Sequence, residues 1–181
     1  AHVGEVVRLL YDWSWLVRHS AAYALSNMGT AGATHAGEVV RLLHDTNESV
    51  QRCAAQTLVK MGSTCAACAP DVASLLRDDS EEVRRLAAEV LGAIGAADSA
   101  HVGEVARLLR DDSERVRLSA VRALSKMGAA VATYASEVAR LLHDESWHVR
   151  RSAASALDKM STVGVEASLT CCAASALDKL D

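Results

Sequence analysis

The histidine and cysteine side chains are the groups in this sequence that could bind a metal ion or act as nucleophiles. Several occupy one position of a repeating pattern: His2, His35, Cys68, His101 and, fifth, Tyr134. Ligands of one metal ion lie about 2.0–2.3 Å from it, whereas packed helices lie about 8–10 Å apart. These residues are therefore predicted to mark the starts of successive helices and not to share a metal ion.

The cysteines include one C-x-x-C pair, Cys65 and Cys68. The pair lies in an Ala-rich segment between repeats, without a strand–helix–strand pattern or a second pair nearby, so a structural role is the favoured interpretation and a redox or metal role the alternative. The spacing of the five cysteines does not suggest a disulfide framework, which favours an intracellular, reducing compartment. They are Cys53, Cys65, Cys68, Cys171 and Cys172.

A second candidate metal site brackets one turn: His143, Glu145 and His148. Because the other repeats lack this set, a metal site there is the less favoured interpretation. The sequence also has no phosphate-binding Gly loop, nucleophile elbow or zinc-protease motif. We therefore expect no catalytic residue, no metal and no cofactor, and predict that the protein is not an enzyme.

The elements that position these residues follow a repeat of 33 residues, aligned from copy to copy without a gap. Seven columns are identical in all five copies; in the first copy they are Val6, Leu9, Leu10, Asp12, Val17, Ala21 and Leu25. The apolar columns recur at helical spacing, which predicts two helices per unit, A and then B. A Ser/Asn column (Ser14 in the first copy) suits the N-cap of helix B, and a Gly column (Gly29) suits its C-terminal end.

The predicted fold is all-α, an α-α superhelix of five two-helix repeats followed by a C-terminal capping helix. The repeats are expected at about 1–33, 34–66, 67–99, 100–132 and 133–160. The capping helix is expected within 161–181, because residues 173–179 copy residues 153–159 without a complete helix A between them. Pro70 fits the first turn of the third helix A. Val3, Val6 and Leu10 lack a preceding repeat, so we expect a partner or an upstream segment to cover them.

The pattern Asp-x4-Val-Arg-x2-Ala-x3-Leu-x2-Met-Gly, seen at Asp111 to Gly128, resembles HEAT repeats, and most closely the short PBS lyase HEAT-like type. The resemblance covers about residues 1–160. It implies that the second helices line a concave face and that Asp and Arg side chains form a ladder between neighbouring repeats. The ladder residues would be Asp12, Asp45, Asp78, Asp111 and Asp144 with Arg18, Arg84, Arg117 and Arg150. Gln51 interrupts the Arg column, which predicts a softer joint there.

The expected concave face carries seven basic side chains and two acidic ones, Glu89 and Asp158, although the chain has a net charge of −4. We predict that it binds the acidic surface of a protein partner. Exposed tryptophans at the A–B turns are predicted contact residues on the edge. The predicted concave residues are Tyr23, Arg52, Lys60, Arg85, Arg122, Lys126, Arg151 and Lys159, and the edge residues are Trp13, Trp15 and Trp147.

The favoured function is a non-catalytic protein-binding scaffold or a structural subunit of a larger assembly. The family resemblance implies one alternative, a bilin-lyase-like or chaperone-like factor for photosynthetic pigment proteins. A nucleic-acid-binding protein is the other, less favoured because the face lacks a run of aromatic residues for stacking bases. The longest uncharged run, residues 20–37, is too polar to span a bilayer, so no transmembrane segment is expected.

Overall fold

The computed structural model describes residues 2–95, 101–127 and 133–162. Within these ranges the secondary structure is helical and contains no strand. The predicted capping helix lies outside the described residues, apart from residues 161 and 162, which belong to the preceding helix.

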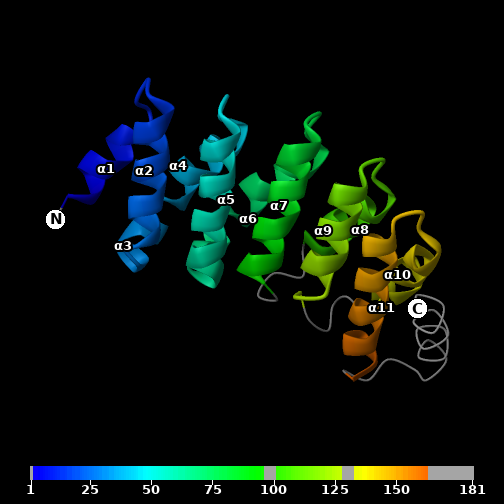
Figure 1. Ribbon diagram of the computed structural model, residues 1–181. Coiled ribbons are helices and arrows are strands. Elements are labelled where there is room, and N and C mark those ends of the chain that lie inside the picture. The colour runs from blue at the N-terminus through cyan, green and yellow to red at the C-terminus, as the bar shows by residue number, and fades with distance from the viewer. Residues whose placement is uncertain (1, 96–100, 128–132, 163–181) are drawn as a thin grey trace.

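Five A–B helix pairs follow one another in the described part of the chain, as the repeat predicts (Figure 1). The A helices are α1 (Val3–Leu9), α4 (Ala36–Arg41), α6 (Ala69–Ser74), α8 (Val102–Arg107) and α10 (Ala135–Arg140). The B helices are α2 (Trp15–Ser26), α5 (Glu48–Met61), α7 (Glu81–Ile94), α9 (Glu114–Leu124) and α11 (Trp147–Thr162). The all-α solenoid is therefore confirmed.

Short helical segments complete the repeats. Four A helices continue into one 3₁₀ turn, namely η1 (Leu42–His44), η3 (Leu75–Arg77), η5 (Leu108–Arg110) and η7 (Leu141–His143). The segments from helix B to the next helix A include α3 (Thr30–Ala33) after the first repeat and η2 (Gly62–Cys68) after the second. Pro70 occupies the first turn of α6, where its missing N–H costs no hydrogen bond.

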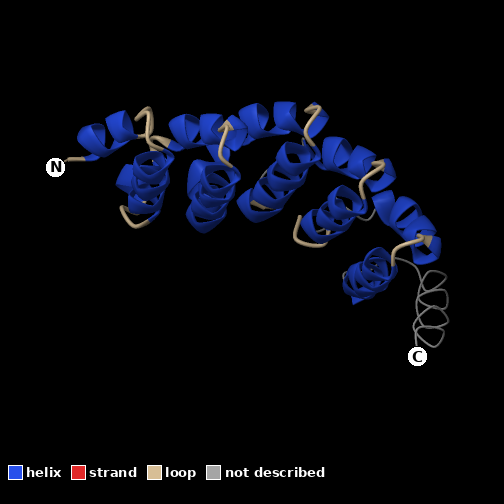
Figure 2. Cartoon of the chain, turned by 45° about the horizontal axis from the view of Figure 1, so that its top comes forward, coloured by secondary structure: helices blue, strands red, loops and turns tan. Residues whose placement is uncertain are grey.

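The repeats form an arc in which the two helix layers have different surroundings. Figure 2 shows the A helices along the outer, convex side and the B helices along the inner side. Each B helix packs against the next one, α2 on α5, α5 on α7, α7 on α9 and α9 on α11. The B layer thus forms a continuous wall, and its free face lines the concavity.

Small and branched side chains fill the space between the layers. The second Val column is fully buried at Val50, Val116 and Val149, and the Ala column is equally buried at Ala54 and Ala87. Small residues let neighbouring B helices approach closely: a Cβ added at Gly92 would lie 2.7 Å from the Cα of Ala123. Close approach of this kind explains why Ala is abundant and Phe absent.

The ends of the B helices follow the predicted columns with one correction. The N-cap positions of three B helices are held by serines whose side chains make no capping hydrogen bond, Ser14, Ser80 and Ser113. Among the B helices whose caps are described, only α5 has a side-chain cap, which Asn47 provides. The Gly column has positive φ, 58°, 54° and 85° at Gly29, Gly62 and Gly95, a region that favours glycine. Ser161 takes this column in the fifth repeat, where α11 continues to Thr162.

In each A–B turn the Asp that recurs in every repeat, and not the serine at the N-cap, accepts a hydrogen bond from a backbone N–H. In the fourth repeat an Asp111 carboxylate oxygen accepts the backbone N–H of Ser113 at 3.0 Å, and the same two-residue contact recurs in every repeat. The following Arg117 donates from Nη1 to the carbonyl oxygens of Asp111 and Asp112, both at 2.9 Å. One Asp and one Arg therefore close the turn in four of the five repeats.

The remaining nitrogens of the same Arg reach the Asp of the next repeat. Nε and Nη2 of Arg18 donate to both carboxylate oxygens of Asp45, at 2.6 and 2.7 Å. Arg84 holds Asp111 in the same way, and Arg117 holds Asp144. These bidentate pairs are mostly buried, which makes them stronger than surface ion pairs. The ladder that the family resemblance implies is present at three joints.

The joint between the second and third repeats lacks this pair. Gln51 keeps the local half of the pattern, since its amide donates to the carbonyl oxygen of Asp45 at 2.7 Å. Asp78 has His44 as its partner in place of an arginine. The Nδ1 atom of His44 lies 3.5 Å from the Asp78 carboxylate, in a more exposed setting than the Arg–Asp pairs. A single long contact thus replaces two short charge-assisted hydrogen bonds, which supports the prediction of a softer joint.

Replacing Gln51 with Arg should complete the ladder. The new guanidinium can keep the bond to the Asp45 carbonyl and add a bidentate pair to Asp78, raising the free energy of unfolding by about 1–2 kcal/mol. Urea denaturation followed by circular dichroism measures the change. The control Gln51→Ala, which only removes a hydrogen bond, should be less stable than the wild type. An arginine variant no more stable than the wild type would contradict the interpretation that this joint is weaker because it lacks an Arg–Asp pair.

The ladder also predicts how stability depends on pH. Burial raises the pKa of Asp45, Asp111 and Asp144, but the hydrogen bonds from Arg and from the turn N–H outweigh burial, and the net pKa lies below the ordinary value. The unfolded chain then binds more protons in acid, so the free energy of unfolding should decrease as the pH falls below about 5.

Asp144→Asn tests the origin of that decrease. The variant should be less stable than the wild type at pH 7, because Arg117 loses its charged partner, and the difference should shrink as the pH falls and the wild-type carboxyl takes up a proton. Urea titrations at several pH values measure both. A difference that stays constant with pH would show that the ladder charge is not responsible.

Candidate partner-binding surface

The concave wall holds a hollow of about 540 Å³ across α5, α7 and α9. Arginines from all three helices line it, together with glutamates from the first turns of α5 and α7. The predicted residues that it brings together are Arg52, Arg85 and Arg122; the lining residues that the prediction did not include are Glu48, Glu81, Glu82, Arg115, Leu118 and Ser119.

Two of the predicted arginines have their charge neutralised within the wall. Arg85 donates to both oxygens of Glu82, at 2.7 and 2.9 Å, and reaches Glu89 at 3.3 Å. The hydrogen bond between them raises the pKa of Arg85 and lowers that of Glu82. Arg52 lies 3.4 Å from Glu48 in an exposed pair. These arginines shape the hollow but contribute little net positive charge.

Basic side chains without an ion pair are concentrated on α9 and the turn that follows it. Arg115, Arg122 and Lys126 are exposed, and within the described residues none of these side chains makes a hydrogen bond or an ion pair, although the charge of Arg115 helps to lower the pKa of Glu82. Leu118 lies between the two arginines in sequence, half-buried, at a position where every other repeat has His or Arg. This helix therefore offers a small apolar site flanked by cations.

The other predicted basic residues are spread along the wall. Lys60 donates to the amide oxygen of Asn27 at 2.6 Å, and the Arg151 guanidinium lies 5.2 Å from the centre of the Trp147 ring. Lys159 is exposed near the end of α11. Tyr23 is 60 % exposed on α2, at the opposite end of the wall from Arg151 and Lys159. The set lies on several helices rather than in one compact patch.

The A–B turn of the first repeat is the most apolar part of the surface. Trp13 is 93 % exposed, and four further large apolar side chains around this turn are between 41 % and 58 % exposed. We call this set the aromatic edge: Leu9, Tyr11, Trp13, Trp15 and Leu16. Tyr11 is tied to the second repeat by a hydrogen bond to Glu38 and by the guanidinium of Arg41, 5.2 Å from its ring centre.

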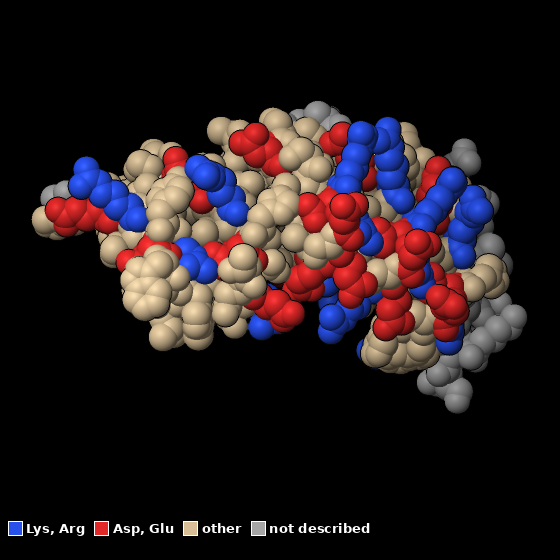
Figure 3. Space-filling view, turned by 90° about the horizontal axis from the view of Figure 1, so that it is seen from above, with Lys and Arg blue, Asp and Glu red and all other residues tan. Residues whose placement is uncertain are grey.

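Other repeats have polar or charged residues at most of these positions. Where the first repeat has Trp13 and Leu16, the third has Asp79 and Glu82. Figure 3, which looks onto the A–B turns, shows uncharged atoms predominating over the first two repeats and charged atoms over the third to fifth. At Trp13 and Leu16 the aromatic edge is thus a local departure from the repeat.

The three predicted tryptophans do not form one patch. Trp13 and Trp15 lie in the first repeat, whereas Trp147 begins α11 at the far end of the solenoid (Figure 1). Trp147 contacts His148 edge to face, with ring centres 5.0 Å apart, and also lies beneath Arg151. Local packing therefore accounts for Trp147, whereas the nearly full exposure of Trp13 has no such explanation.

The exposed apolar surface of the first helix differs from the expectation. Leu10 is only 2 % exposed because it points into the core beside α2, while Val3 and Val6 are half-buried. Leu9 is 44 % exposed instead, and its counterparts Leu42 and Leu108 are buried. The uncovered end of the stack is therefore Leu9 together with parts of Val3 and Val6.

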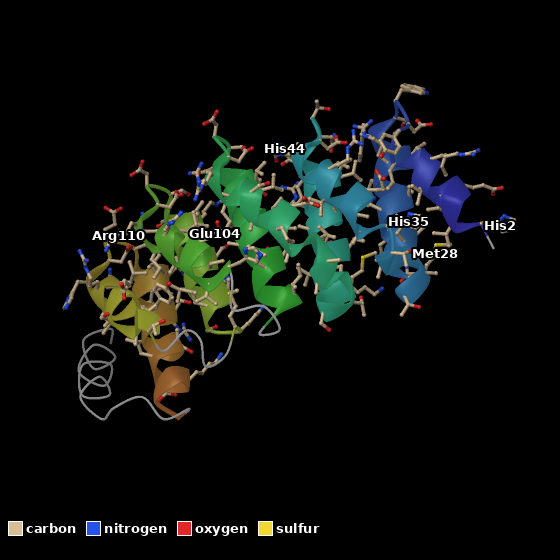
Figure 4. All side chains as sticks on the ribbon, turned by 180° about the vertical axis from the view of Figure 1, so that it is seen from behind. His2, Met28, His35, His44, Glu104 and Arg110 are labelled. Carbon is tan, nitrogen blue, oxygen red and sulfur yellow. The ribbon has the colours of Figure 1, made fainter. Side chains whose placement is uncertain are left out.

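The histidine positions do not converge on a metal ion in the part of the chain described. His2 and His35 precede successive A helices and lie well apart along the convex side (Figure 4). Among the described residues, no three His, Cys, Asp or Glu side chains are placed to bind one metal ion. In the candidate turn Glu145 reaches Arg117 at 3.2 Å and His148 packs on Trp147.

Comparison with known families and proteins identifies the repeat. The family models for HEAT repeats match residues 69–138, and the model for a single HEAT repeat matches residues 136–164. No curated protein matches the chain. Among the described helices, none has both the length and the apolar composition needed to cross a bilayer.

Several solved structures share the fold at low sequence identity. The complex of CpcE and CpcF of phycocyanin lyase from Nostoc sp. PCC7120 matches with a TM-score of 0.70 at 18% identity, over 88% of this chain and 65% of that one. An engineered protein gives 0.63 at 18% identity, over 99% and 96% of the two chains. A designed armadillo repeat protein in complex with the peptide (KR)4 gives 0.59 at 20% identity over 100% of both chains.

The aromatic edge can be tested without a partner. A variant that keeps only Trp13, with Trp15→Phe and Trp147→Phe, should show strong quenching of its fluorescence by acrylamide, because the indole is almost fully exposed. The matched variant that keeps only Trp147 should be quenched less, because its ring packs on His148 and Arg151. Equal quenching in the two variants would contradict the placement of Trp13.

Proposed function

The chain belongs to the HEAT-repeat family, and from this premise we propose that it is a non-catalytic scaffold that holds a protein partner on its concave wall and aromatic edge. In this role it would be one subunit of a larger assembly. A solenoid suits the task because its exposed columns can change without disturbing the packed ones. The proposal assigns binding, and no chemical step, to the exposed residues.

One observation carries the proposal: a 93 % exposed tryptophan lies in a cluster of apolar side chains where other repeats have polar or charged ones. Exposed apolar clusters of this kind on a protein surface mark interaction sites. Trp and Tyr are also the residues that most often dominate the binding energy of protein interfaces. Trp13, with Leu16 beside it, is the anchor that we assign to the partner.

The charges of the wall, three repeats along the solenoid from this anchor, indicate the second surface that the partner presents. Arg122 on α9 and Lys126 just after it make no ion pair within the described chain, so an acidic protein segment could pair with them. A nucleic acid fits less well, because Glu48, Glu81 and Glu82 share the hollow and would repel a run of phosphates. We therefore favour a short acidic protein surface over nucleic acid.

A second candidate function is a factor that assists the assembly of photosynthetic pigment proteins, with or without a lyase activity. It is favoured by the similarity in shape to the phycocyanin lyase complex of CpcE and CpcF, which at 18% identity is a similarity of fold alone. A partnership between two such chains would fit the scaffold role. We assign no residue of this chain to bilin attachment.

We also propose that the protein works in a reducing compartment. Cys53, Cys65 and Cys68 are free thiols in the described part of the chain, and all three are buried. Three buried free thiols in this part of the chain are typical of proteins kept under reducing conditions.

Co-purification tests the scaffold proposal. A tagged full-length chain, isolated from cells of the organism that produces it, should bring down a stoichiometric protein, which mass spectrometry identifies. The purified partner is then titrated by calorimetry against Trp13→Ala/Leu16→Ala and against Arg122→Glu/Lys126→Glu. Loss of a hot-spot residue should weaken binding by about 30-fold or more. The charge reversal should weaken binding most at low salt.

The matched control is a charge reversal on the convex side, Arg107→Glu/Arg110→Glu, which should bind like the wild type. Circular dichroism should show that all variants keep their helicity, because none of the changed residues belongs to the buried columns. If the aromatic-edge and α9 variants both retain wild-type affinity, neither surface binds the partner.

A further inference from the structure

Cys65 and Cys68 lie one turn apart in η2, the 3₁₀ segment that joins α5 to α6. The backbone bends at Cys65 (φ −105°, ψ 23°), and the Cys65 thiol donates to the carbonyl oxygens of Gly62 and Leu58, at 3.1 and 3.7 Å. In a regular 3₁₀ turn, residues three apart lie on the same side, separated by about 6 Å. A disulfide requires Cα atoms about 4.4–6.8 Å apart. The spacing of the pair is therefore compatible with a disulfide.

A hollow gives access to the pair. It has a volume of about 480 Å³, lies between the loops that follow α2 and α5, and is lined by both cysteines together with Thr30, Thr34 and Asp71. The cysteines are 2 % and 4 % exposed, so the bulk surface does not present them. A small molecule that enters the hollow would meet both sulfur atoms, whereas a large protein surface would meet neither.

We propose that Cys65 and Cys68 form a thiol–disulfide exchange site whose substrate is a low-molecular-weight disulfide of the glutathione type. The inference is independent of the scaffold proposal, because it uses neither the concave wall nor the aromatic edge. It rests on the turn that holds both cysteines and on the hollow that both of them line.

The two cysteines have different roles in the reaction. The neighbouring Cys68 lowers the pKa of Cys65, whereas Cys65 and burial raise the pKa of Cys68. Cys65 is therefore the first of the two to ionise, and its thiolate attacks one sulfur of the disulfide, forming a mixed disulfide and releasing one thiolate. Cys68 then loses its proton to water and attacks the Cys65 sulfur, forming the Cys65–Cys68 disulfide and releasing the second thiol. Two protein thiols are oxidised and one disulfide is reduced to two thiols.

The site lies at the joint that lacks the regular ladder pair. Gln51 and His44 alter the A–B side of the junction between the second and third repeats, and the cysteine pair lies in the B–A connection of the same junction. A Cys65–Cys68 bond would close the turn through which α5 continues into α6. The redox state of the pair would thus act on the one joint that the ladder leaves weak.

The test uses the folded full-length chain with Cys171→Ser and Cys172→Ser, which leaves Cys53, Cys65 and Cys68. It is incubated with glutathione disulfide and reduced glutathione at a series of ratios, quenched in acid and mapped by peptide mass spectrometry. We expect a Cys65–Cys68 disulfide that appears and disappears reversibly with the ratio. Cys53 is the internal control: it is buried, has no cysteine partner, and should stay reduced.

Single substitutions test the assigned roles. Cys68→Ser should stop the reaction at a glutathione adduct on Cys65, while Cys65→Ser should leave Cys68 largely unmodified. An adduct that forms on Cys68 in preference to Cys65 would overturn the assignment. If the pair stays reduced in the folded chain, or is oxidised only as fast as Cys53 is modified, the exchange site does not exist. The measurement on the unsubstituted pair decides this even if a single variant fails to fold.

Discussion

The hydrogen bonds of one partly buried aspartate per repeat hold this solenoid in register. Each Asp accepts a turn N–H within its own repeat, and at three joints it also accepts two hydrogen bonds from the Arg of the preceding repeat. The same Arg ties its own turn through two carbonyl oxygens. One ion pair thus sets both the shape of a turn and the position of the neighbouring repeat, which satisfies the buried charges on both sides.

Because packing and the ladder depend on a fixed set of columns, the exposed columns are free to vary. The Asp, Arg, Val, Ala and Leu columns serve packing and the ladder, so a change on the outer face of a B helix or in an A–B turn does not disturb the stack. In the first repeat the variable positions hold apolar residues such as Trp13 and Leu16. In the fourth repeat they hold cations without an ion pair, such as Arg122. The surface therefore differs along the arc although the backbone repeats.

The joint between the second and third repeats departs from the ladder pattern. Gln51 retains the bond to its own turn and loses the bond to the next repeat, so local structure is unchanged while the coupling between repeats is weakened. In a solenoid, stability is close to a sum of repeat terms and nearest-neighbour terms. A single weak interface is then the place where the array can bend or separate first, and the cysteine pair lies at that interface.

The sequence alone determined the helices, their order and the residues of the core, because helical periodicity and a repeat without gaps are local and additive properties. The ladder followed from the resemblance to a known repeat. Only the tertiary structure decided that Arg85 is neutralised by Glu82, that Leu9 and not Leu10 is exposed, that Trp147 lies far from Trp13, and that Cys65 and Cys68 line one hollow. Each of these depends on the angle between neighbouring helices and on which side chains meet across a turn or a groove, and column identity does not encode that geometry.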